Sequence, residues 1–69
     1  MKLSENLLKY RKEKALSQEA VASALGMATR VYQRYEHGER EPQASVLIAM
    51  ADFFEVSLDE LVGRERADT

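Results

Sequence analysis

The sequence predicts one compact all-α domain of five helices, and three observations lead to this expectation. Apolar residues recur at the three- and four-residue spacing of helices, and no segment shows the strict alternation of a half-buried strand. Glycine and proline stand between the periodic segments, where helices end and begin. The 69 residues are enough for one domain, and a chain this short hides only about 60% of its unfolded surface on folding. We therefore expect no large substrate cavity, no small-molecule ligand, and a function on an outer face.

The composition is that of an ordinary globular protein, with 45% hydrophobic and 32% charged residues. Asp52 and Glu55 interrupt the longest apolar region, which falls short of the roughly 18 residues of a membrane span. The N-terminus turns polar within a few residues and is not a signal peptide. The lack of cysteine excludes a disulfide framework and a thiolate metal site, which fits an intracellular protein. His37 is the only histidine and has no carboxylate at a metal-binding spacing, so we expect no metal, no cofactor and no membrane association.

The net charge of −2 counts against a nucleic-acid partner, because phosphate contacts need Lys and Arg. The charges are, however, unevenly distributed. Residues 1–40 hold eight Lys or Arg and five Glu, which gives +3, whereas residues 41–69 hold two Arg and seven Asp or Glu, which gives −5. A basic N-terminal half is compatible with one DNA-facing side, although +3 is weak support on its own.

The first predicted helix runs from about Glu5 to Lys14, with Ser4 as its N-cap. Its buried stripe consists of Leu3, Leu7 and Tyr10, at helical spacing.

The second predicted helix runs from Gln18 to Leu25, with Ser17 as its N-cap. Its inward stripe consists of Val21, Ala24 and Leu25. Gly26 then stands where the C-terminus of a helix favours a left-handed residue.

The third predicted helix follows a tight turn at residues 26–28 and runs from Thr29 to Glu36 or His37. At about 100° per residue, its side chains divide into two faces. The apolar face consists of Val31, Tyr32 and Tyr35. The polar face consists of Thr29, Arg30, Gln33, Arg34 and His37. With the preceding helix this is the outline of a helix-turn-helix unit, whose second helix can enter a DNA major groove.

Pro42 marks the start of a fourth helix, which extends to about Phe54 and is the most hydrophobic element. Its inward stripe consists of Ala44, Leu47, Ile48, Ala51 and Phe54, widened by Met50 and Phe53. The segment SLDE at residues 57–60 is a capping box that opens a short fifth helix, which ends at Gly63. We expect residues 1–63 to form the domain and residues 64–69 to form a frayed tail.

Several parts of the sequence share an order and a spacing that are specific in combination. They are Arg11, LSQEAVASALG at residues 16–26, RVYQRYEHGEREP at residues 30–42, VLIAMADFFEVSLDEL at residues 46–61, and Gly63. Together they resemble the Cro and phage-repressor (XRE) family of helix-turn-helix transcriptional regulators, over about residues 3–63. The resemblance implies a five-helix, lambda-repressor-like domain that binds double-stranded operator DNA, usually as a homodimer. It also implies a bacterial or phage-encoded protein that works in the cytoplasm, at the nucleoid.

The resemblance implies roles for individual residues. Gln18 matches the position whose side chain reaches the phosphate backbone, while Arg11 and Glu36 match an ion pair that bridges the first and third helices. The positions that face base edges are matched by Thr29, Arg30, Gln33 and Arg34. Arginine suits guanine and glutamine suits adenine, but contact with a base or with a phosphate stays open for each residue. We also expect His37 and Arg40 to lie near the DNA backbone.

The sequence departs from the family pattern at three positions next to helix ends. Gln43 replaces a frequent Ser after the proline. Ala28 stands where a capping Ser or Thr is usual, which makes Thr29 an alternative cap that would be less free to contact DNA. Glu55 replaces a Gly or Asn, which would adopt a left-handed conformation more easily.

The last quarter of the domain carries much apolar surface for its size. Part of it closes the core, and the rest is a candidate two-fold interface, with a closed monomer as the alternative. The interface candidates are Phe53, Val56, Leu58, Leu61 and Val62. The predicted function is a DNA-binding repressor, and the main alternative is an antitoxin-like or adaptor module that binds another protein. An enzyme is not expected, because the sequence lacks a nucleophile paired with a base, a Gly-rich phosphate loop and a ligand cluster.

Overall fold

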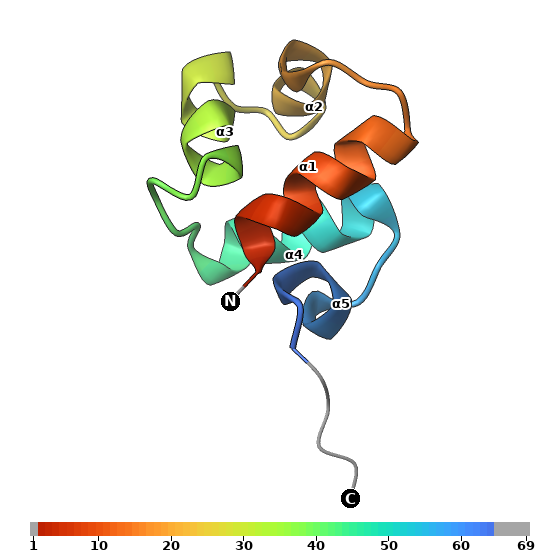
Figure 1. Ribbon diagram of the computed structural model, residues 1–69. Helices are drawn as coiled ribbons and strands as arrows, with labels where there is room; N and C mark the ends of the chain where they lie inside the picture. Colours follow the sequence, from red (N-terminus) through yellow and green to blue (C-terminus); the bar gives the residue numbers. More distant parts are fainter. Residues whose placement is uncertain (1, 65–69) are drawn as a thin grey trace, which may run out of the picture.

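The computed structural model describes residues 2–64 and contains five α-helices and no strand in this part of the chain (Figure 1). The helices are α1 (Leu3–Glu13), α2 (Gln18–Ala24), α3 (Thr29–Glu36), α4 (Ala44–Phe54) and α5 (Leu58–Val62). The predicted all-α fold is therefore confirmed. Of the predicted frayed tail, residues 65–69 lie outside the described residues. None of the helices within residues 2–64 is both long enough and apolar enough to cross a membrane.

Each helix contributes one large, fully buried side chain to the core. In the order of the helices these are Leu7, Val21, Tyr32, Met50 and Leu61. Helix α1 runs through the middle of the domain and contacts both α3 and α5, while α2 packs on α3 and α4 packs on α5 (Figure 1). Full burial of such a side chain contributes about 1.5 to 3 kcal/mol, so this core holds α2 and α3 firmly against the other helices.

Helix α1 begins earlier than predicted. Its N-cap is Lys2 instead of Ser4, and the helix begins at Leu3. The backbone N–H of Lys2 donates to the carbonyl oxygen of Val62 at 2.8 Å, which ties the start of α1 to the end of α5. Because this contact joins residues far apart in the sequence, the local pattern around Ser4 does not indicate it.

The inward side of α2 differs from the predicted one at Ala24, which is exposed. Val21 is buried as predicted, and the small Ala22 is fully buried as well. Successive residues are about 100° apart on a helix, so the half-buried Leu25 falls between Val21 and Ala22, while Ala24 points away from them.

The inward side of α4 is rotated from the predicted one. Ala44 is exposed and Ile48 is 50% exposed, whereas Met50 is fully buried. The stripe that faces the core consists of Leu47, Met50, Ala51 and Phe54. A helix that is apolar on most sides leaves open which side faces inward, and packing decides it.

Each of the five helices is followed by a residue in the left-handed backbone conformation, and after α1 and α4 that residue is not a glycine. Gly26 ends α2 with φ 73°, as predicted, and Glu55 ends α4 with φ 59°. Ala15, just after α1, has φ 56°, which the sequence did not indicate. The left-handed conformation costs a non-glycine residue roughly 1–2 kcal/mol, so the turns after α1 and α4 are strained.

Candidate nucleic-acid interface

Helices α2 and α3 are joined by a short turn that fixes their mutual orientation. The hydroxyl of Ser17 accepts a hydrogen bond from the backbone N–H of Ala20 at 3.0 Å and caps α2. The turn closes when the N–H of Met27 donates to the carbonyl oxygen of Ala22 at 3.0 Å. Ala28 is the N-cap of α3 and makes no side-chain capping bond, so α3 begins without one. Thr29 is the first helical residue and is half-buried, so the alternative that Thr29 is the cap is wrong.

The outward side of α3 carries two free guanidinium groups. Arg30 and Arg34 are exposed, and neither side chain makes a hydrogen bond or ion pair with another of residues 2–64. His37, at the end of the helix, is exposed as well. A free guanidinium presents donors in a planar fork that matches either a phosphate or the acceptor edge of guanine.

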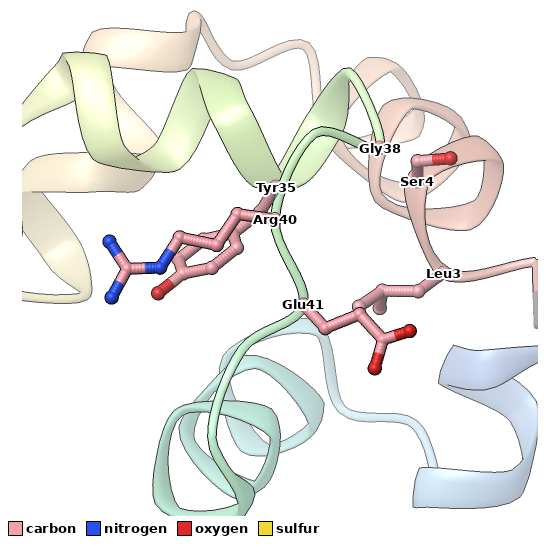
Figure 2. Close-up of a pocket in the computed structure, with 6 residues that line it drawn as sticks. All are labelled: Leu3, Ser4, Tyr35, Gly38, Arg40 and Glu41. Atoms are coloured by element: carbon pink, nitrogen blue, oxygen red, sulfur yellow. The ribbon is translucent and has the colours of Figure 1, made fainter.

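Arg40 lies in the loop after α3, beside the aromatic ring of Tyr35. Its guanidinium carbon is 5.9 Å from the centre of that ring, a cation–π distance. Both residues line an open cavity of about 190 Å³ between this loop and the first turn of α1, and the guanidinium points away from Ser4 (Figure 2). The cavity is smaller than the roughly 300–1,000 Å³ of small-molecule sites. Arg40 is exposed, so its guanidinium is available as a cation after the end of α3.

Behind this surface, Glu36 and Arg11 form a nearly buried ion pair between α3 and α1. Arg11 Nε donates to Glu36 Oε2 at 2.8 Å and Arg11 Nη2 donates to Glu36 Oε1 at 2.9 Å, in a two-pronged arrangement. The side chains of Arg11 and Glu36 are 14% and 3% exposed. Arg11 Nη1 also donates to the carbonyl oxygen of Leu16 at 2.9 Å, so the same guanidinium also holds the backbone of the segment between α1 and α2.

The hydrogen bonds around Glu36 keep its carboxylate charged. Burial alone would raise the pKa of Glu36, but hydrogen bonds from Arg11, Gln18 and Tyr32 outweigh burial and hold this pKa below its ordinary value. The hydroxyl of Tyr32 donates to Glu36 Oε2 at 2.8 Å. Burial, and then this hydrogen bond, raise the pKa of Tyr32 above its ordinary range, so its proton stays in place.

Gln18 joins this buried group to the outward side of α3. Gln18 Nε2 donates to Glu36 Oε1 at 2.8 Å, and Gln18 Oε1 accepts a hydrogen bond from Gln33 Nε2 at 3.0 Å. Gln18 and Gln33 are both half-buried. Of the residues predicted to contact DNA, the structure links these two by a hydrogen bond and gives both ends of the Gln18 amide partners inside the protein.

The apolar residues of the last quarter are only partly at the surface. Leu58 is 45% exposed, while the other candidates Phe53, Val56 and Val62 are half-buried. Leu61 is fully buried in the core and is withdrawn from the predicted interface, because it offers no surface to a second copy.

Comparison with known proteins identifies the family. A helix-turn-helix family model matches residues 7–61, which is most of the chain. The chain belongs to the helix-turn-helix family of Cro and phage-repressor (XRE) type. It is 45% identical to the uncharacterized HTH-type transcriptional regulator YqaE of Bacillus subtilis over 90% of this chain and 53% of YqaE. It is 38% identical to the cryptic phage CTXphi transcriptional repressor RstR of Vibrio cholerae over 99% of this chain and 61% of RstR.

The same family supplies a solved structural neighbour. The NMR structure of the DNA-binding domain of the P22 C2 repressor superposes with a TM-score of 0.80 and 25% identity, over 86% of this chain and 78% of that one. This chain spans only about half to three-fifths of the length of its relatives YqaE and RstR.

Two features of this helix-turn-helix domain were not predicted. Tyr32 was assigned to core packing alone, although its spacing of four residues from Glu36 places both on one side of α3 and was a usable signal. The hydrogen bond between Gln18 and Gln33 has no such signal, because its partners are 15 residues apart on different helices.

Proposed function

We infer that this chain is a sequence-specific regulator of transcription, acting as a repressor, which inserts α3 into the major groove of double-stranded operator DNA. The observation that carries this proposal is the outward side of α3, where Arg30 and Arg34, which have no hydrogen-bond partner among residues 2–64, flank Gln33. Arginine and glutamine are the side chains that make paired hydrogen bonds to guanine and adenine. An operator lies in the bacterial cytoplasm, which is where such a regulator acts.

Residues at the ends of α3 supply the sequence-independent part of binding in this proposal. His37 and Arg40 are exposed and follow the residues that face the bases, and in this proposal they contact phosphates. Thr29 lies at the start of the helix, next to the turn. Phosphate contacts fix the position of a helix in the groove, and base contacts provide specificity. The relatives support this assignment, since RstR is a transcriptional repressor and the P22 neighbour is a DNA-binding domain.

Two copies bind one operator in this proposal. The exposed Leu58 and the half-buried Phe53, Val56 and Val62 supply apolar surface for a two-fold contact near α5. Such a homodimer would place two copies of α3 about 34 Å apart on one side of the DNA, at successive major grooves. In vitro selection from a randomised duplex library tests this directly, because a dimer selects two half-sites about 10 base pairs apart.

The second candidate function is a protein-interaction module with the same fold. It is favoured by large apolar side chains that are exposed on three helices, namely Leu8, Ile48 and Leu58. A gel shift with random duplex DNA distinguishes the two functions. A DNA-binding regulator gives a retarded species at low salt that weakens steeply as salt increases, whereas an adaptor gives none.

Arg34→Ala tests the assignment of α3. We expect a loss of about 5- to 150-fold in affinity for the selected site, with relaxed preference at one base pair, because a paired arginine contact is worth about 1–3 kcal/mol. Arg64→Ala removes the same charge after α5 and should leave base preference unchanged. Unchanged affinity and specificity in a folded Arg34→Ala protein would contradict the placement of α3 in the groove.

A further inference from the structure

Helix α5 is too short to keep its place by its own hydrogen bonds. It has five residues, and isolated helices shorter than about 12–15 residues are marginal in water. The last four carbonyl groups of any α-helix also lack partners within the helix. Contacts with the rest of the domain must therefore hold the end of α5.

The start of α1 supplies partners for the end of α5. Asn6 Nδ2 donates to the carbonyl oxygen of Glu60 at 3.2 Å and to that of Leu61 at 3.0 Å. The backbone N–H of Lys2 donates to the carbonyl oxygen of Val62 at 2.8 Å. Carbonyl oxygens only accept hydrogen bonds, so the NH₂ end of the Asn6 amide is the end that must face them. Three successive carbonyl groups of α5 are thus bound by Lys2 and Asn6.

The packing between these two helix ends is close. A Cβ atom added to Gly63, the residue after α5, would lie 2.8 Å from Cβ of Lys2 and 3.2 Å from Asn6 Nδ2. One turn further along α1, the hydroxyl of Tyr10 donates to the carbonyl oxygen of Glu60 at 3.4 Å. These contacts hold α5 against α1 in one arrangement.

Helix α1 holds α3 as well, through a different side. Arg11 of α1 forms the two-pronged ion pair with Glu36 of α3, at 2.8 and 2.9 Å. At about 100° per residue, Asn6 and Arg11 lie about 140° apart around α1. Figure 1 shows α1 between α3 and α5, and α1 packs against both. The position of α3 relative to α5 is therefore set through α1.

We propose that Asn6 determines which spacing of two operator half-sites the protein accepts, because it holds the end of α5 against α1. This inference rests on the proposed function, in which α3 lies in the major groove and the two-fold contact is near α5. In such a dimer the position of α3 relative to α5 sets the separation of the two copies of α3. Asn6 acts through α5 and is a positioning residue.

The cost of a wrong spacing depends on how firmly α5 is held. Each added base pair moves one half-site by about 3.4 Å and turns it by about 35° relative to the other. A dimer that keeps both half-sites on such an operator has to shift α5 relative to α1. In the wild type this shift breaks the two hydrogen bonds of Asn6, whereas in Asn6→Ala they are already absent. Asn6→Ala therefore lowers the cost of a wrong spacing.

The experiment uses the whole chain and duplexes that carry two copies of the half-site selected by the wild type. The centre-to-centre spacing is varied by one and two base pairs on either side of the selected one, and affinities are measured by fluorescence anisotropy. The variants are Asn6→Ala and Asn6→Asp, which turns an acceptor toward the carbonyl oxygens. Glu5→Ala is the matched control, because Glu5 is exposed on α1 and its side chain makes no hydrogen bond or ion pair with another of residues 2–64. Thermal unfolding checks that every variant is folded.

We expect the wild type to prefer one spacing and Asn6→Ala to reduce this preference by about 5-fold or more, the value of two hydrogen bonds. Asn6→Asp should reduce it further, and Glu5→Ala should leave it unchanged. Base preference within each half-site should be the same in all of these proteins. Tyr10→Phe removes only a hydroxyl and should reduce the preference slightly, which keeps the inference testable if the Asn6 variants do not fold.

Two outcomes would overturn the inference. The first is a folded Asn6→Ala protein that loses affinity by the same factor at every spacing, which is the behaviour of a residue that only stabilises the domain. The second is an unchanged spacing preference in Asn6→Ala and Asn6→Asp, or in Tyr10→Phe where these do not fold. Either result leaves the proposed function standing. A wild-type protein that binds single half-sites without any spacing preference would instead overturn the two-copy part of the proposed function, and the inference with it.

Discussion

Replacing Glu36 by alanine tests whether the ion pair between α1 and α3 stabilises the domain. The carboxylate accepts hydrogen bonds from Arg11 Nε and Nη2, from Gln18 Nε2 and from the hydroxyl of Tyr32. Because the Arg11 side chain is only 14% exposed, Glu36→Ala leaves a nearly buried guanidinium without a counter-charge. Removal of one partner from a buried ion pair costs about 3–5 kcal/mol.

This loss is large compared with the total stability that a domain of this length has. At about 0.05–0.15 kcal/mol per residue, 69 residues give a free energy of unfolding of about 3–10 kcal/mol. We therefore expect Glu36→Ala to lower the Tm by at least about 12 °C, since 1 kcal/mol corresponds to about 4–8 °C in a domain of this size. Circular dichroism during thermal and urea unfolding measures both quantities.

The matched variants are Arg11→Ala and the double substitution of Arg11 and Glu36. The double variant leaves no unpaired charge, so its loss should be clearly smaller than the sum of the two single losses. The reasoning would be refuted if Glu36→Ala cost less than about 1 kcal/mol, the value of an exposed pair, or if the two losses were additive.

Acidification and two substitutions at helix ends are also expected to change the free energy of unfolding. The pKa of Glu36 is lower in the folded than in the unfolded chain, so the charged carboxylate contributes to the free energy of unfolding above its ordinary pKa of 4.5. This contribution is lost as the pH falls below that value. Urea unfolding of Glu36→Gln should lack this part of the acid dependence. Glu55→Gly should stabilise the domain by about 0.5–1 kcal/mol, because glycine adopts the left-handed conformation without a steric penalty, and a lower urea midpoint would contradict this. Gly63→Ala should destabilise the domain by more than about 1 kcal/mol, because Gly63 has φ +74° and the new Cβ would lie 2.8 Å from Cβ of Lys2. An unchanged Tm would exclude the clash.

Helix boundaries could be predicted wherever a local signal sets them. Ser17 caps α2, Gly26 ends it, and the capping box that Ser57 opens is present with both of its hydrogen bonds, as the sequence indicated. The start of α1 could not be predicted, because the contact of Lys2 with Val62 depends on the folded arrangement of α1 and α5. The inward side of α4 could not be predicted either, because this helix is apolar on several sides and tertiary packing determines which of them is buried.

The candidate site divides in the same way. The outward side of α3 follows from helical periodicity, which places Arg30 and Arg34 at the surface. The chain through Gln18 could not be predicted, because it requires side chains from α1, α2 and α3 to meet, and hydrogen-bond direction is not encoded in spacing.

The position of Glu36 has a consequence for how such a domain changes its target sequence. Arg30 and Arg34 are exposed and make no side-chain hydrogen bond or ion pair with the rest of residues 2–64, so, in the proposed function, substitutions there can change affinity and base preference with little effect on folding. Gln33 is different, because its amide belongs to a hydrogen-bonded chain that ends at the ion pair of α1 and α3. A substitution that presents the wrong end to Gln18 leaves a donor facing a donor or an acceptor facing an acceptor, which costs stability as well as specificity. The two arginines can therefore vary independently, whereas Gln33 has to change together with Gln18.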